Sequence, residues 1–391
     1  MTRVLIDCTA IPVNRAGVGR YLEGLLSGLS ELTADPSSSA SDLEIVLVVQ
    51  RRDRESFAAL APTAQVVDIH PRFGNRPLRL LWEQWGLPTL ARSLKADVVH
   101  SPHYTFPVCN RGARVVTLHD GTFFSEPGVH GFLKRHFFRM WIRAVWHSSG
   151  GVIADSRATS DDITAAIGKP RARVSVAHLG VDLAVFSPPS PAAIAEFRLN
   201  IGLPTDSQWL AFLGTIEPRK NLGALLDAYQ IVRQSLGPAT PPLLISGGRG
   251  WDEPVLARLD ALAPDSGIHV LGYLPFEQLP ALLGGAQAVL YPSLGEGFGL
   301  PVLEAMACGA TVITTDRLAI PEVGGDAVAY TRVDAVAIAV RILEVLGDAE
   351  LRQTLGERAV ARAATFTWRA TAERHAEAYH AAAISARPSR N

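Results

Sequence analysis

The chain has 391 residues, a length that exceeds one ordinary hydrophobic core and predicts two or three domains. Its net charge is −1 with charged residues at 19%, so it lacks the basic excess of a nucleic-acid-binding protein. Three widely spaced cysteines, Cys8, Cys109 and Cys308, form no CxxC pair and argue against a disulfide framework or a zinc site.

The same features indicate a compartment. No uncharged apolar run approaches the roughly 18 residues of a membrane-spanning helix. The N-terminal segment MTRVLIDCTA enters a strand at once and has no signal-peptide core. Because unpaired cysteines suit a reducing environment, we expect a cytoplasmic protein.

Short β-branched runs alternate with longer helical stretches along the whole chain, which is the pattern of parallel α/β sheets. The predicted strands are residues 4–6, 44–49, 66–69, 97–100, 114–118, 151–154 and 174–177, then 210–213, 243–246, 269–271, 288–290, 311–314 and 327–330. Between the two sets, the run SPPSP at residues 187–191 is incompatible with a helix or a central strand and predicts a linker. We therefore predict two α/β domains, residues 1–186 and 187–369.

Two glycines, Gly17 and Gly19, follow the first predicted strand and lead into an apolar helix. A dinucleotide-binding fingerprint would need a third glycine where this chain has Leu22, which counts against an oxidoreductase. The glycines indicate either a loop close to phosphate or acceptor, or a plain strand-to-helix turn.

Histidines lie at the carboxyl ends of two predicted strands, where open α/β sheets bind ligands. His100 and His103 belong to one strand end, and His119 follows the next strand. A histidine in such a place is also a common turn residue. Residues 155–157 and 178–182, at the ends of the last two strands of this domain, are interpreted as structural turns.

Residues 132–147, FLKRHFFRMWIRAVWH, carry four Lys or Arg residues, no acid, and aromatic residues at helical spacing. Such a helix can rest on an anionic membrane. A helix packed on the core with a solvated basic edge has the same pattern. The first interpretation predicts a peripheral membrane contact at the inner face.

The second domain opens with a strand that ends in GTIEPRKNL and places Arg219 and Lys220 at its carboxyl end. A departing nucleoside diphosphate develops negative charge that fixed cations stabilise. Because Glu296 leaves the same sheet edge, we expect this basic pair to face that site. A glycine turn at residues 246–251 lacks the GK[ST] ending of a P-loop, so ATP hydrolysis is not supported.

The most informative stretch is YPSLGEGFGLPVLEAMACGATVITTD, residues 291–316. Three alternating glycines follow a strand, and a helix begins at Leu300 with Pro301 in its first turn. Free N–H groups and the positive end of the helix dipole form an anion site there. Glu296 and Glu304 flank it. Because carboxylates repel phosphate, we expect a ligand whose hydroxyls bind the two glutamates and whose phosphates bind the backbone N–H groups. A nucleotide sugar has this distribution of groups.

The segment from Glu296 to Glu304, with GFGLP between the glutamates and EAMACG after them, resembles the signature of the retaining group 4 glycosyltransferases of GT-B architecture. The resemblance implies two Rossmann-like domains whose parallel sheets face an interdomain cleft. It also implies that the last helix, within residues 370–391, crosses back to the N-terminal domain. The N-terminal domain would bind the acceptor and the C-terminal domain the nucleotide sugar.

The resemblance also implies roles for single residues. It matches His119 to a cleft histidine that contacts the donor sugar or stabilises the reacting centre, and the basic pair to groups that bind the diphosphate. Glu304 would hold the ribose and Glu296 would orient the sugar. The implied catalytic residues are His119, Arg219, Lys220 and Glu296, and the implied donor-binding residues are Gly17, Gly19, Arg219, Lys220, Glu296, Gly297, Phe298, Gly299, Leu300 and Glu304.

No two aspartates are separated by a single residue, so the metal-binding Asp-x-Asp pair of the other main glycosyltransferase fold is missing. We expect catalysis without metal or cofactor and, by family analogy, retention of configuration without a committed protein nucleophile. The motifs resemble those of bacterial mannosyltransferases that use GDP-mannose, although users of UDP-glucose, UDP-N-acetylglucosamine and dTDP-rhamnose carry close variants. The expected acceptor is a glycan or a lipid-linked saccharide.

Two other functions fit a GT-B protein. A sugar-nucleotide 2-epimerase would convert the nucleotide sugar without an acceptor, but its motifs are not those present. A catalytically silent binding subunit would be expected to lack at least one residue of the set His119, Arg219, Lys220, Glu296 and Glu304, all of which are present.

Overall fold

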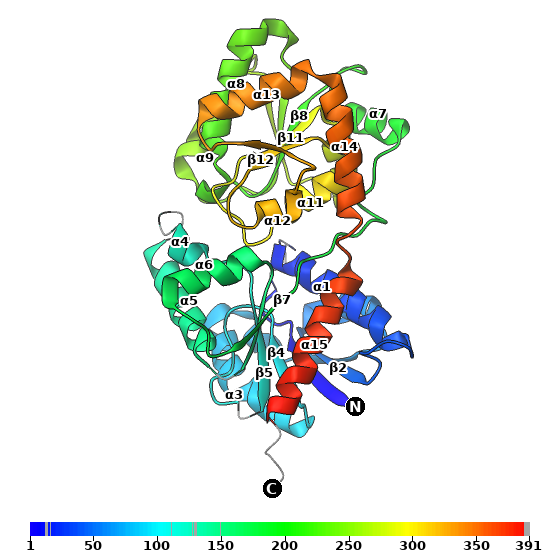
Figure 1. Cartoon of the computed structure of the whole chain (residues 1–391), viewed down its shortest axis with the longest axis vertical. Helices are drawn as coiled ribbons and strands as arrows, with labels where there is room; N and C mark the ends of the chain where they lie inside the picture. The colour runs from blue at the N-terminus through cyan, green and yellow to red at the C-terminus, as the bar shows by residue number, and fades with distance from the viewer. Residues whose placement is uncertain are drawn as a thin grey trace. The chain divides into compact units, whose positions relative to one another are not determined.

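The structure is a computed structural model that describes residues 1–11, 15, 17–110, 112–126, 128, 131–148 and 150–386. The chain divides into two compact units (Figure 1). The first comprises Met1–Gly180 and the segment that begins at Phe366, and the second comprises Val181–Thr365. The chain leaves the first unit a few residues before the predicted boundary at 186 and returns to it shortly before residue 370.

The first unit is built on a parallel sheet. Within the described residues it has seven strands in the order β3-β2-β1-β4-β5-β6-β7. The strands are β1 (Thr2–Asp7), β2 (Leu43–Gln50), β3 (Gln65–Ile69), β4 (Val98–Ser101), β5 (Ala113–Leu118), β6 (Gly151–Ala154) and β7 (Arg173–Val176). Each overlaps a predicted strand, because buried β-branched runs fit a sheet that helices cover on both faces.

The helices of this unit lie between and after these strands. They are α1 (Gly17–Ala34), α2 (Arg54–Leu60), α3 (Arg76–Ser93), α4 (Thr122–Ser125), α5 (Phe132–Trp146), α6 (Arg157–Ile167) and α15 (Trp368–Ala386), with single 3₁₀ turns at Arg51–Asp53 and Pro71–Gly74. The predicted basic-aromatic helix and the predicted last helix correspond to α5 and α15.

Helix α15 packs beside α1 (Figure 1). Glycines make this close approach possible, since a Cβ at Gly24 would lie 2.0 Å from the Trp368 ring and one at Gly28 would lie 2.3 Å from the Trp368 carbonyl oxygen. Gly180 makes room for the Trp368 backbone in the same way. Arg369 adds ion pairs to Glu31 at 2.7 Å and to Asp35 at 3.0 Å. Helix α15 is thus an integral part of the first unit.

The second unit holds another parallel sheet, whose order in the described part of the chain is β10-β9-β8-β11-β12-β13. Its strands are β8 (Leu210–Leu213), β9 (Leu243–Ser246), β10 (Ile268–Gly272), β11 (Ala288–Tyr291), β12 (Val312–Thr315) and β13 (Ala329–Thr331). The helices are α7 (Pro191–Asn200), α8 (Leu222–Leu236), α9 (Glu253–Asp260), α10 (Leu279–Gly284), α11 (Leu300–Ala307), α12 (Ile320–Gly324), α13 (Ala335–Gly347) and α14 (Ala349–Ala363), with 3₁₀ turns at Pro218–Lys220, Gly237–Ala239 and Phe276–Gln278. The predicted two-domain, parallel-sheet fold is therefore confirmed.

The linker prediction was wrong at its last residue. Helix α7 begins at Pro191, and the Ser190 hydroxyl accepts a hydrogen bond from the Ala193 N–H at 3.2 Å. Proline suits the first position of a helix because its missing N–H would have no intrahelical partner there. Serine is a favoured N-cap, so the Ser-Pro pair starts the helix.

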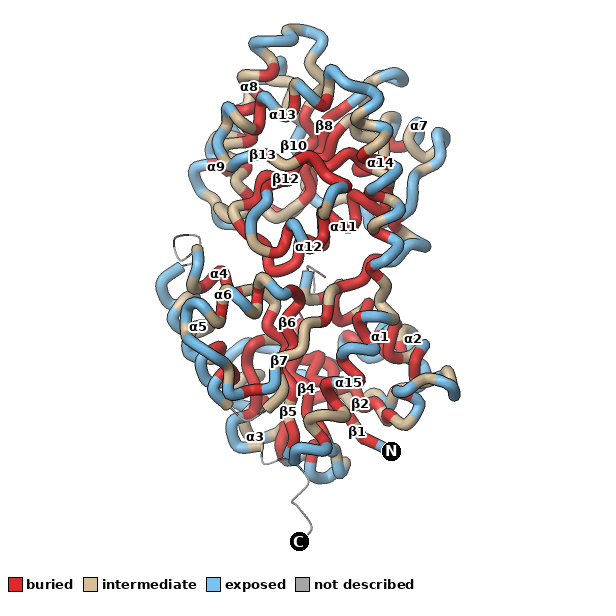
Figure 2. The backbone as a smooth tube through the Cα atoms, viewed as in Figure 1, coloured by how far each residue is buried: buried red, intermediate tan, exposed pale blue. Residues whose placement is uncertain are grey.

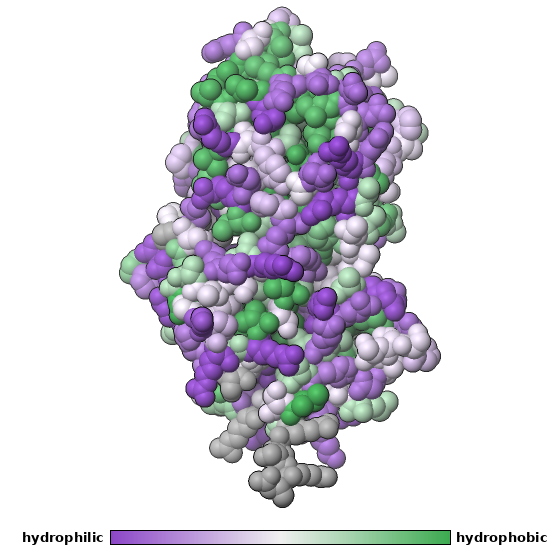
Figure 3. Space-filling view, viewed as in Figure 1, coloured by the Kyte–Doolittle hydropathy of each residue, from purple (hydrophilic) through white to green (hydrophobic). Residues whose placement is uncertain are grey.

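Burial follows the sheets. In Figure 2 the central strands of both units are buried and the outer turns of the surrounding helices are exposed. The core of the second unit includes Phe212, Tyr229 and Leu290, all at most 1% exposed. Over the face drawn in Figure 3, hydrophilic and hydrophobic residues are interspersed.

Candidate active site

The order of each sheet reverses at one point, between β1 and β4 in the first unit and between β8 and β11 in the second. Open α/β sheets bind ligands outside the carboxyl ends of the strands at such a switch point. Arg219 and Lys220 follow β8, and Glu296 follows β11. The predicted residues of the second unit therefore flank its switch point.

The basic pair lies on the 3₁₀ turn Pro218–Lys220, between β8 and α8. The turn ends at Asn221 with φ +57°, a left-handed conformation that asparagine tolerates better than most residues. The neighbouring loop after β9 supports this turn, because the Ile216 N–H donates to the Gly248 carbonyl at 3.0 Å and the Trp251 N–H donates to the Ile216 carbonyl at 3.1 Å. The loop positions of the two cations are thus fixed by backbone contacts.

Arg219 lies between two carboxylates. Its Nη2 donates to Glu217 at 2.7 Å, and its Nη1 donates to the Gly295 carbonyl at 2.9 Å and to the Glu296 carboxylate. The Leu294 N–H donates in return to the Arg219 carbonyl at 2.8 Å. These bonds tie the loop after β8 to the loop after β11 across the switch point.

Lys220 reaches the other oxygen of Glu296, with Nζ to Oε1 at 2.8 Å, and also donates to the Tyr291 hydroxyl. The same oxygen accepts from the Ser293 hydroxyl at 2.6 Å and from the Tyr291 hydroxyl at 3.1 Å. Lys220 and Glu296 are both less than 10% exposed. Glu296 therefore holds both cations in one buried cluster.

The pKa values of the cluster follow from burial and charge. Burial alone would raise the pKa of Glu296, but Arg219, Lys220 and the hydrogen bonds outweigh it and hold the pKa at about 2. Burial and the neighbouring Arg219 lower the pKa of Lys220, while Glu296 opposes them. Burial and Glu296 raise the pKa of Tyr291 well above its usual value, so its hydroxyl stays protonated. At neutral pH Glu296 is an anion held by fixed donors.

The glycine loop and α11 complete this edge. Gly299 has φ +104° and caps α11, where its carbonyl accepts from Val302 at 2.9 Å. Phe298 and Leu300 are buried, and Glu304 is 2% exposed within the same helix. The Ala319 N–H donates to the Glu296 carbonyl at 3.3 Å, so the loop after β12 braces the glutamate from its other side.

Three residues of this cluster, Glu217, Tyr291 and Ser293, were missed as functional from the sequence. They form hydrogen bonds with Glu296 or with the basic pair but do not belong to the motif between Glu296 and Glu304. Their position at the ends of β8 and β11, next to predicted site residues, was the signal that could have indicated them.

His119 belongs to the first unit and follows β5 directly. Its Nδ1 lies 2.8 Å from an Asp155 oxygen and its Nε2 lies 2.8 Å from the Pro102 carbonyl oxygen. A carbonyl and a carboxylate only accept, so both ring nitrogens donate. Burial lowers the pKa of His119, but the charge and hydrogen bond of Asp155 outweigh it, and the pKa is raised. Asp155 lies in the bend between β6 and α6, as predicted, and in addition bonds to His119, while Ser156 caps α6.

Of the two other histidines near this edge, His100 is an interior residue and His103 is partly exposed. His100 is fully buried, with Nε2 2.9 Å from the Thr117 hydroxyl and Nδ1 2.8 Å from the Tyr379 hydroxyl. Burial lowers the pKa of His103 to about 3. The sequence left both as candidates for the acceptor side, and for His100 the structure contradicts this, because both of its ring nitrogens bond to interior side chains.

Gly17 and Gly19 open α1, at the carboxyl end of β1. A Cβ at Gly17 would meet nothing within 4 Å, and one at Gly19 would lie 3.1 Å from the Arg15 side chain. Neither glycine has a positive φ. Packing within the described residues thus does not require glycine at position 17, and the donor-binding role of both residues stays a prediction. Residues 12–14 and 16 of this loop lie outside the described residues.

Helix α5 has both a core-packed part and exposed apolar residues, the two features that its sequence allowed. Ile142, Val145 and Trp146 are buried, as in a core-packed helix, whereas Phe132 is 66% and Leu133 82% exposed. Arg139 is anchored to the protein, since its Nε donates to the Phe123 carbonyl at 2.6 Å.

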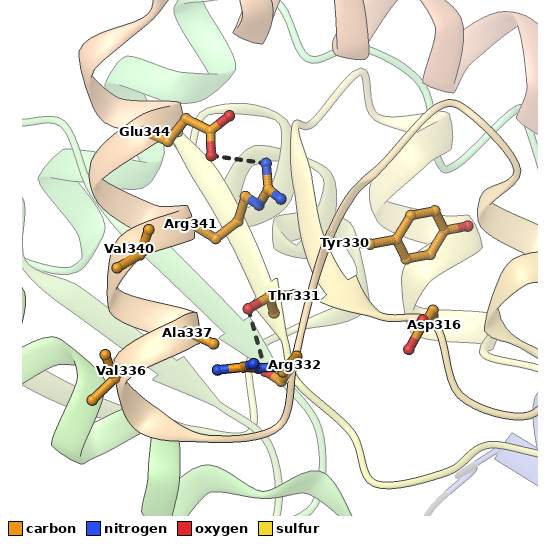
Figure 4. A pocket seen from close by; sticks show the side chains of 9 residues that line it. All are labelled: Asp316, Tyr330, Thr331, Arg332, Val336, Ala337, Val340, Arg341 and Glu344. Atoms are coloured by element: carbon orange, nitrogen blue, oxygen red, sulfur yellow. Dashed lines mark hydrogen bonds and ion pairs between the residues drawn. The ribbon is translucent and has the colours of Figure 1, made fainter.

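A separate pocket of about 430 Å³ is lined mainly by residues of β13 and α13 (Figure 4). Its walls carry both charges, and Arg341 pairs with Glu344 there at 2.8 Å. The lining residues are Asp316, Tyr330, Thr331, Arg332, Val336, Ala337, Val340, Arg341 and Glu344. None of the predicted site residues is among them, so we assign it no part in the proposed chemistry.

Among the residues that the structure describes, no group of three or more His, Cys, Asp or Glu side chains could hold a metal ion. In the same part of the chain, no helix has both the length and the apolar composition that crossing a bilayer requires.

Comparison with known proteins gives two family matches. Residues 16–185 match the model described as Glycosyltransferase Family 4, and residues 194–362 match Glycosyl transferases group 1. O-antigen chain mannosyltransferase B of Escherichia coli is 33% identical over 289 residues, covering 73% of this chain and 74% of that protein. A D-inositol 3-phosphate glycosyltransferase of Mycobacteroides abscessus is 30% identical over 302 residues, covering 74% of this chain but 60% of that protein.

Solved structures agree in fold. The Anabaena protein HepE in complex with UDP-glucose superposes with a TM-score of 0.75 at 17% identity, covering 97% of this chain and 100% of that one. Sucrose-phosphate synthase of Thermosynechococcus elongatus gives a TM-score of 0.73 at 18% identity, covering 97% and 99%. These identities support likeness of fold alone.

Two Rossmann-like units with these sheet orders define the GT-B class. Within it, the chain belongs to the glycosyltransferases of family 4, with the group 1 glycosyl transferase domain as its second half, and is a transferase.

Proposed function

We propose that this glycosyltransferase moves mannose from GDP-mannose to a glycan or lipid-linked saccharide acceptor, with retention of configuration and without a metal ion. The observation that carries the proposal is the buried cluster of Arg219, Lys220 and Glu296 at the switch point of the second unit. The mannosyltransferase of Escherichia coli, 33% identical to this chain, supports mannose as the sugar.

The second unit is the proposed donor-binding unit, and the first the acceptor-binding unit. Arg219 and Lys220 would neutralise the diphosphate, aided by the N–H groups that begin α11. Those two charges are balanced in the free protein by Glu217 and Glu296, which hold the cations in place before the donor arrives. Preorganised charges cost no rearrangement when negative charge develops on the leaving group.

Glu296 and Glu304 are proposed to bind hydroxyls of the donor, Glu296 on the sugar and Glu304 on the ribose. Glu296 remains ionised at every physiological pH because its pKa is about 2. It therefore acts as a hydrogen-bond acceptor rather than as a proton donor. Gly297, Phe298, Gly299 and Leu300 complete the proposed donor site.

His119 is proposed to contact the reacting sugar from the first unit. Its Nε2–H is the group that a sugar hydroxyl would share with the Pro102 carbonyl. Asp155 keeps the ring protonated and oriented, as a carboxylate does for a histidine in many active sites. Gly17 and Gly19 are proposed to approach the donor closely.

The test is a panel of GDP-mannose, UDP-glucose, UDP-N-acetylglucosamine and dTDP-rhamnose, assayed for donor hydrolysis and for transfer, with and without EDTA. We expect turnover of GDP-mannose that EDTA leaves unchanged, and NMR of the product should show the anomeric configuration of the donor. Loss of activity in EDTA would refute metal independence. An epimeric nucleotide sugar formed without acceptor would instead identify an epimerase.

A peripheral membrane contact through α5 is proposed as the way the protein reaches a lipid-linked acceptor. Phe132, Leu133 and Met140 are exposed on this helix, which also carries Lys134, Arg135, Arg139 and Arg143. Anionic lipids attract such basic residues, each by about 1 kcal/mol near the surface. We propose the inner face of the cytoplasmic membrane as the location, since the three cysteines are unpaired and suit a reducing compartment.

Sedimentation with vesicles of anionic phospholipid tests the contact. Reversal of the four α5 charges should abolish co-sedimentation, while vesicles of neutral lipid should not sediment the wild-type protein. Reversal of the exposed charges Arg332 and Asp334 in the second unit serves as a control. Equal partitioning of wild type and α5 variant would remove the proposal.

A further inference from the structure

The last helix of the chain carries His375 and Tyr379 into the interior of the first unit. Both are fully buried, as are Tyr21 of α1, His100 of β4 and Thr117 of β5. Five buried polar side chains in one place need partners, because an unpaired polar group in the interior costs free energy. Each of them has partners here, and the bonds join them into one chain.

The direction of the first bonds follows from Thr371. Its carbonyl oxygen lies 2.8 Å from His375 Nδ1 and can only accept, so Nδ1 carries a proton. Burial lowers the pKa of His375 to about 4, so the ring is neutral and its Nε2 accepts. Nε2 lies 2.8 Å from the Tyr21 hydroxyl, which therefore donates to it.

The remaining bonds are then fixed as well. The Tyr21 hydroxyl has given its one proton to His375, so it accepts from the Thr117 hydroxyl at 2.9 Å. Thr117 accepts in turn from His100 Nε2–H at 2.9 Å. His100 is neutral because burial lowers its pKa, so its Nδ1 accepts from the Tyr379 hydroxyl at 2.8 Å. A single proton arrangement satisfies the whole set.

We call this set the polar relay; its members are Tyr379, His100, Thr117, Tyr21 and His375. One of its members, Tyr21, contacts His119, and two others lie close in sequence to His119 or to a hydrogen-bond partner of its ring. The Tyr21 ring packs edge-on against the His119 ring, with centroids 4.9 Å apart and planes at 73°. Thr117 lies on β5, two residues before His119, which follows the strand. His100 lies two residues before Pro102, whose carbonyl accepts from His119.

His119 and the two histidines of the polar relay differ in charge. Asp155 raises the pKa of His119 through its charge and its hydrogen bond, and the charge of Asp120 adds a weaker effect, so these neighbours favour the cationic form of His119. The positive charge of His119 lowers the pKa of both His100 and His375, in addition to burial. One cation thus lies beside two neutral histidines, and the tautomers of the neutral pair follow from the bonds.

We infer that the polar relay, completed by the C-terminal helix, positions His119 for its proposed contact with the donor, so that Tyr21 and His375 are positioning residues for transfer. The inference rests on the proposed role of His119. It makes α15 a determinant of catalysis as well as of folding, because the helix supplies the acceptor that fixes the Tyr21 hydroxyl and hence the ring against which His119 packs.

The first test reads the protons directly and needs no substrate. NMR of the full chain with ¹⁵N-labelled histidine should show His375 protonated on Nδ1, His100 protonated on Nε2, and His119 protonated on both nitrogens, as its two acceptors require. In Tyr21→Phe, which keeps the ring and removes the hydroxyl, the His119 signals should shift. His375 protonated on Nε2, or His119 signals that do not change in Tyr21→Phe, would overturn the inference.

The second test separates positioning from stability. Tyr21→Phe should lower kcat about 10-fold or more with the donor KM changed less than about twofold, since small misplacements of a reacting group have effects of this size. Tyr229→Phe removes a hydroxyl whose one proton is shared between the Pro241 and Gly267 carbonyl oxygens in the second unit, and should lower stability but not kcat. His375→Gln, whose amide oxygen can accept from Tyr21, should retain more kcat than His375→Ala.

His119→Ala distinguishes a failure of the proposed role of His119 from a failure of the positioning inference. If it retains wild-type turnover of the donor identified in the panel, the proposed role of His119 is wrong. If His119→Ala is inactive while Tyr21→Phe and His375→Ala keep wild-type kcat, the role of His119 stands and the positioning inference fails.

Discussion

Replacement of Glu296 by glutamine tests the buried cluster most sharply. Glutamine keeps the size of the side chain but removes the charge that Arg219 and Lys220 share, at an exposed fraction of 6%. The pKa of Glu296 is about 2 against an ordinary 4.5. At about 1.4 kcal/mol per pKa unit, the difference corresponds to about 3 kcal/mol of folding stability at pH 7. Breaking a buried ion pair from one side costs a similar amount, about 3–5 kcal/mol.

The pH dependence has a definite sign. The folded protein lowers the pKa of Glu296, so its stabilisation is complete above about pH 4.5 and is lost as the pH falls toward about 2. Near pH 3 roughly half should remain. The difference between wild type and Glu296→Gln should therefore be largest at neutral pH and shrink in acid.

Differential scanning calorimetry at pH 7, 5 and 3 measures this. About 3 kcal/mol should lower the transition of the second unit by roughly 6–12 °C at pH 7, given about 2–4 °C per kcal/mol for domains of this size. Glu196→Gln, an exposed glutamate on α7, is the matched control and should change stability by less than about 0.5 kcal/mol. An unchanged transition at pH 7, or a difference of equal size at pH 7 and pH 3, would refute the reasoning.

Four further outcomes are expected. Arg219→Ala should lower kcat by about 10²–10³ in the donor assay, because a charge-stabilising group is lost. Glu304→Ala should weaken nucleotide binding by roughly 1–3 kcal/mol in calorimetric titrations with GDP. Near-normal kcat in the first variant together with near-normal GDP affinity in the second would refute the proposed site. Gly299→Ala should lower the free energy of unfolding in urea by about 1–2 kcal/mol or more, since φ of Gly299 is +104° and the new Cβ would lie 2.8 Å from Ile320 Cδ1. Wild-type stability of this variant would contradict the left-handed backbone conformation at Gly299. A thiol reagent should label Cys109 rapidly in the native state and the two buried cysteines only after unfolding; fast labelling of more than one thiol would contradict their burial.

Much of the fold could be predicted because its signals are local. Each strand is a short apolar run that a covered parallel sheet requires, and the glycines before Leu300 indicate the turn that α11 needs. The anion site and the flanking glutamates could be inferred from one continuous stretch of sequence. Pro191 shows the limit of a composition rule, since a proline-rich run can also start a helix when a serine precedes the last proline.

The pairing of side chains could not be predicted, because it depends on strand register and on contacts between distant segments. Asp155 meets His119 only because β5 and β6 are neighbours, with Leu118 opposite Ala154. The bond between Tyr379 and His100 joins residues 279 positions apart. Nor does a sequence motif indicate that Glu296 already holds the two cations that were expected to bind the diphosphate.

The first unit takes its last helix from the end of the chain, which has a consequence for biosynthesis. A ribosome delivers residues 1–180 well before Trp368, so the early part of the first unit waits, with the space beside Gly24 and Gly28 unfilled, until the segment that holds Trp368 has been made. The continuous second unit has all its segments by residue 365 and can fold before the first is whole. A premature stop just after that position would thus yield an intact second unit joined to an unfinished first unit that exposes apolar surface to chaperones and proteases.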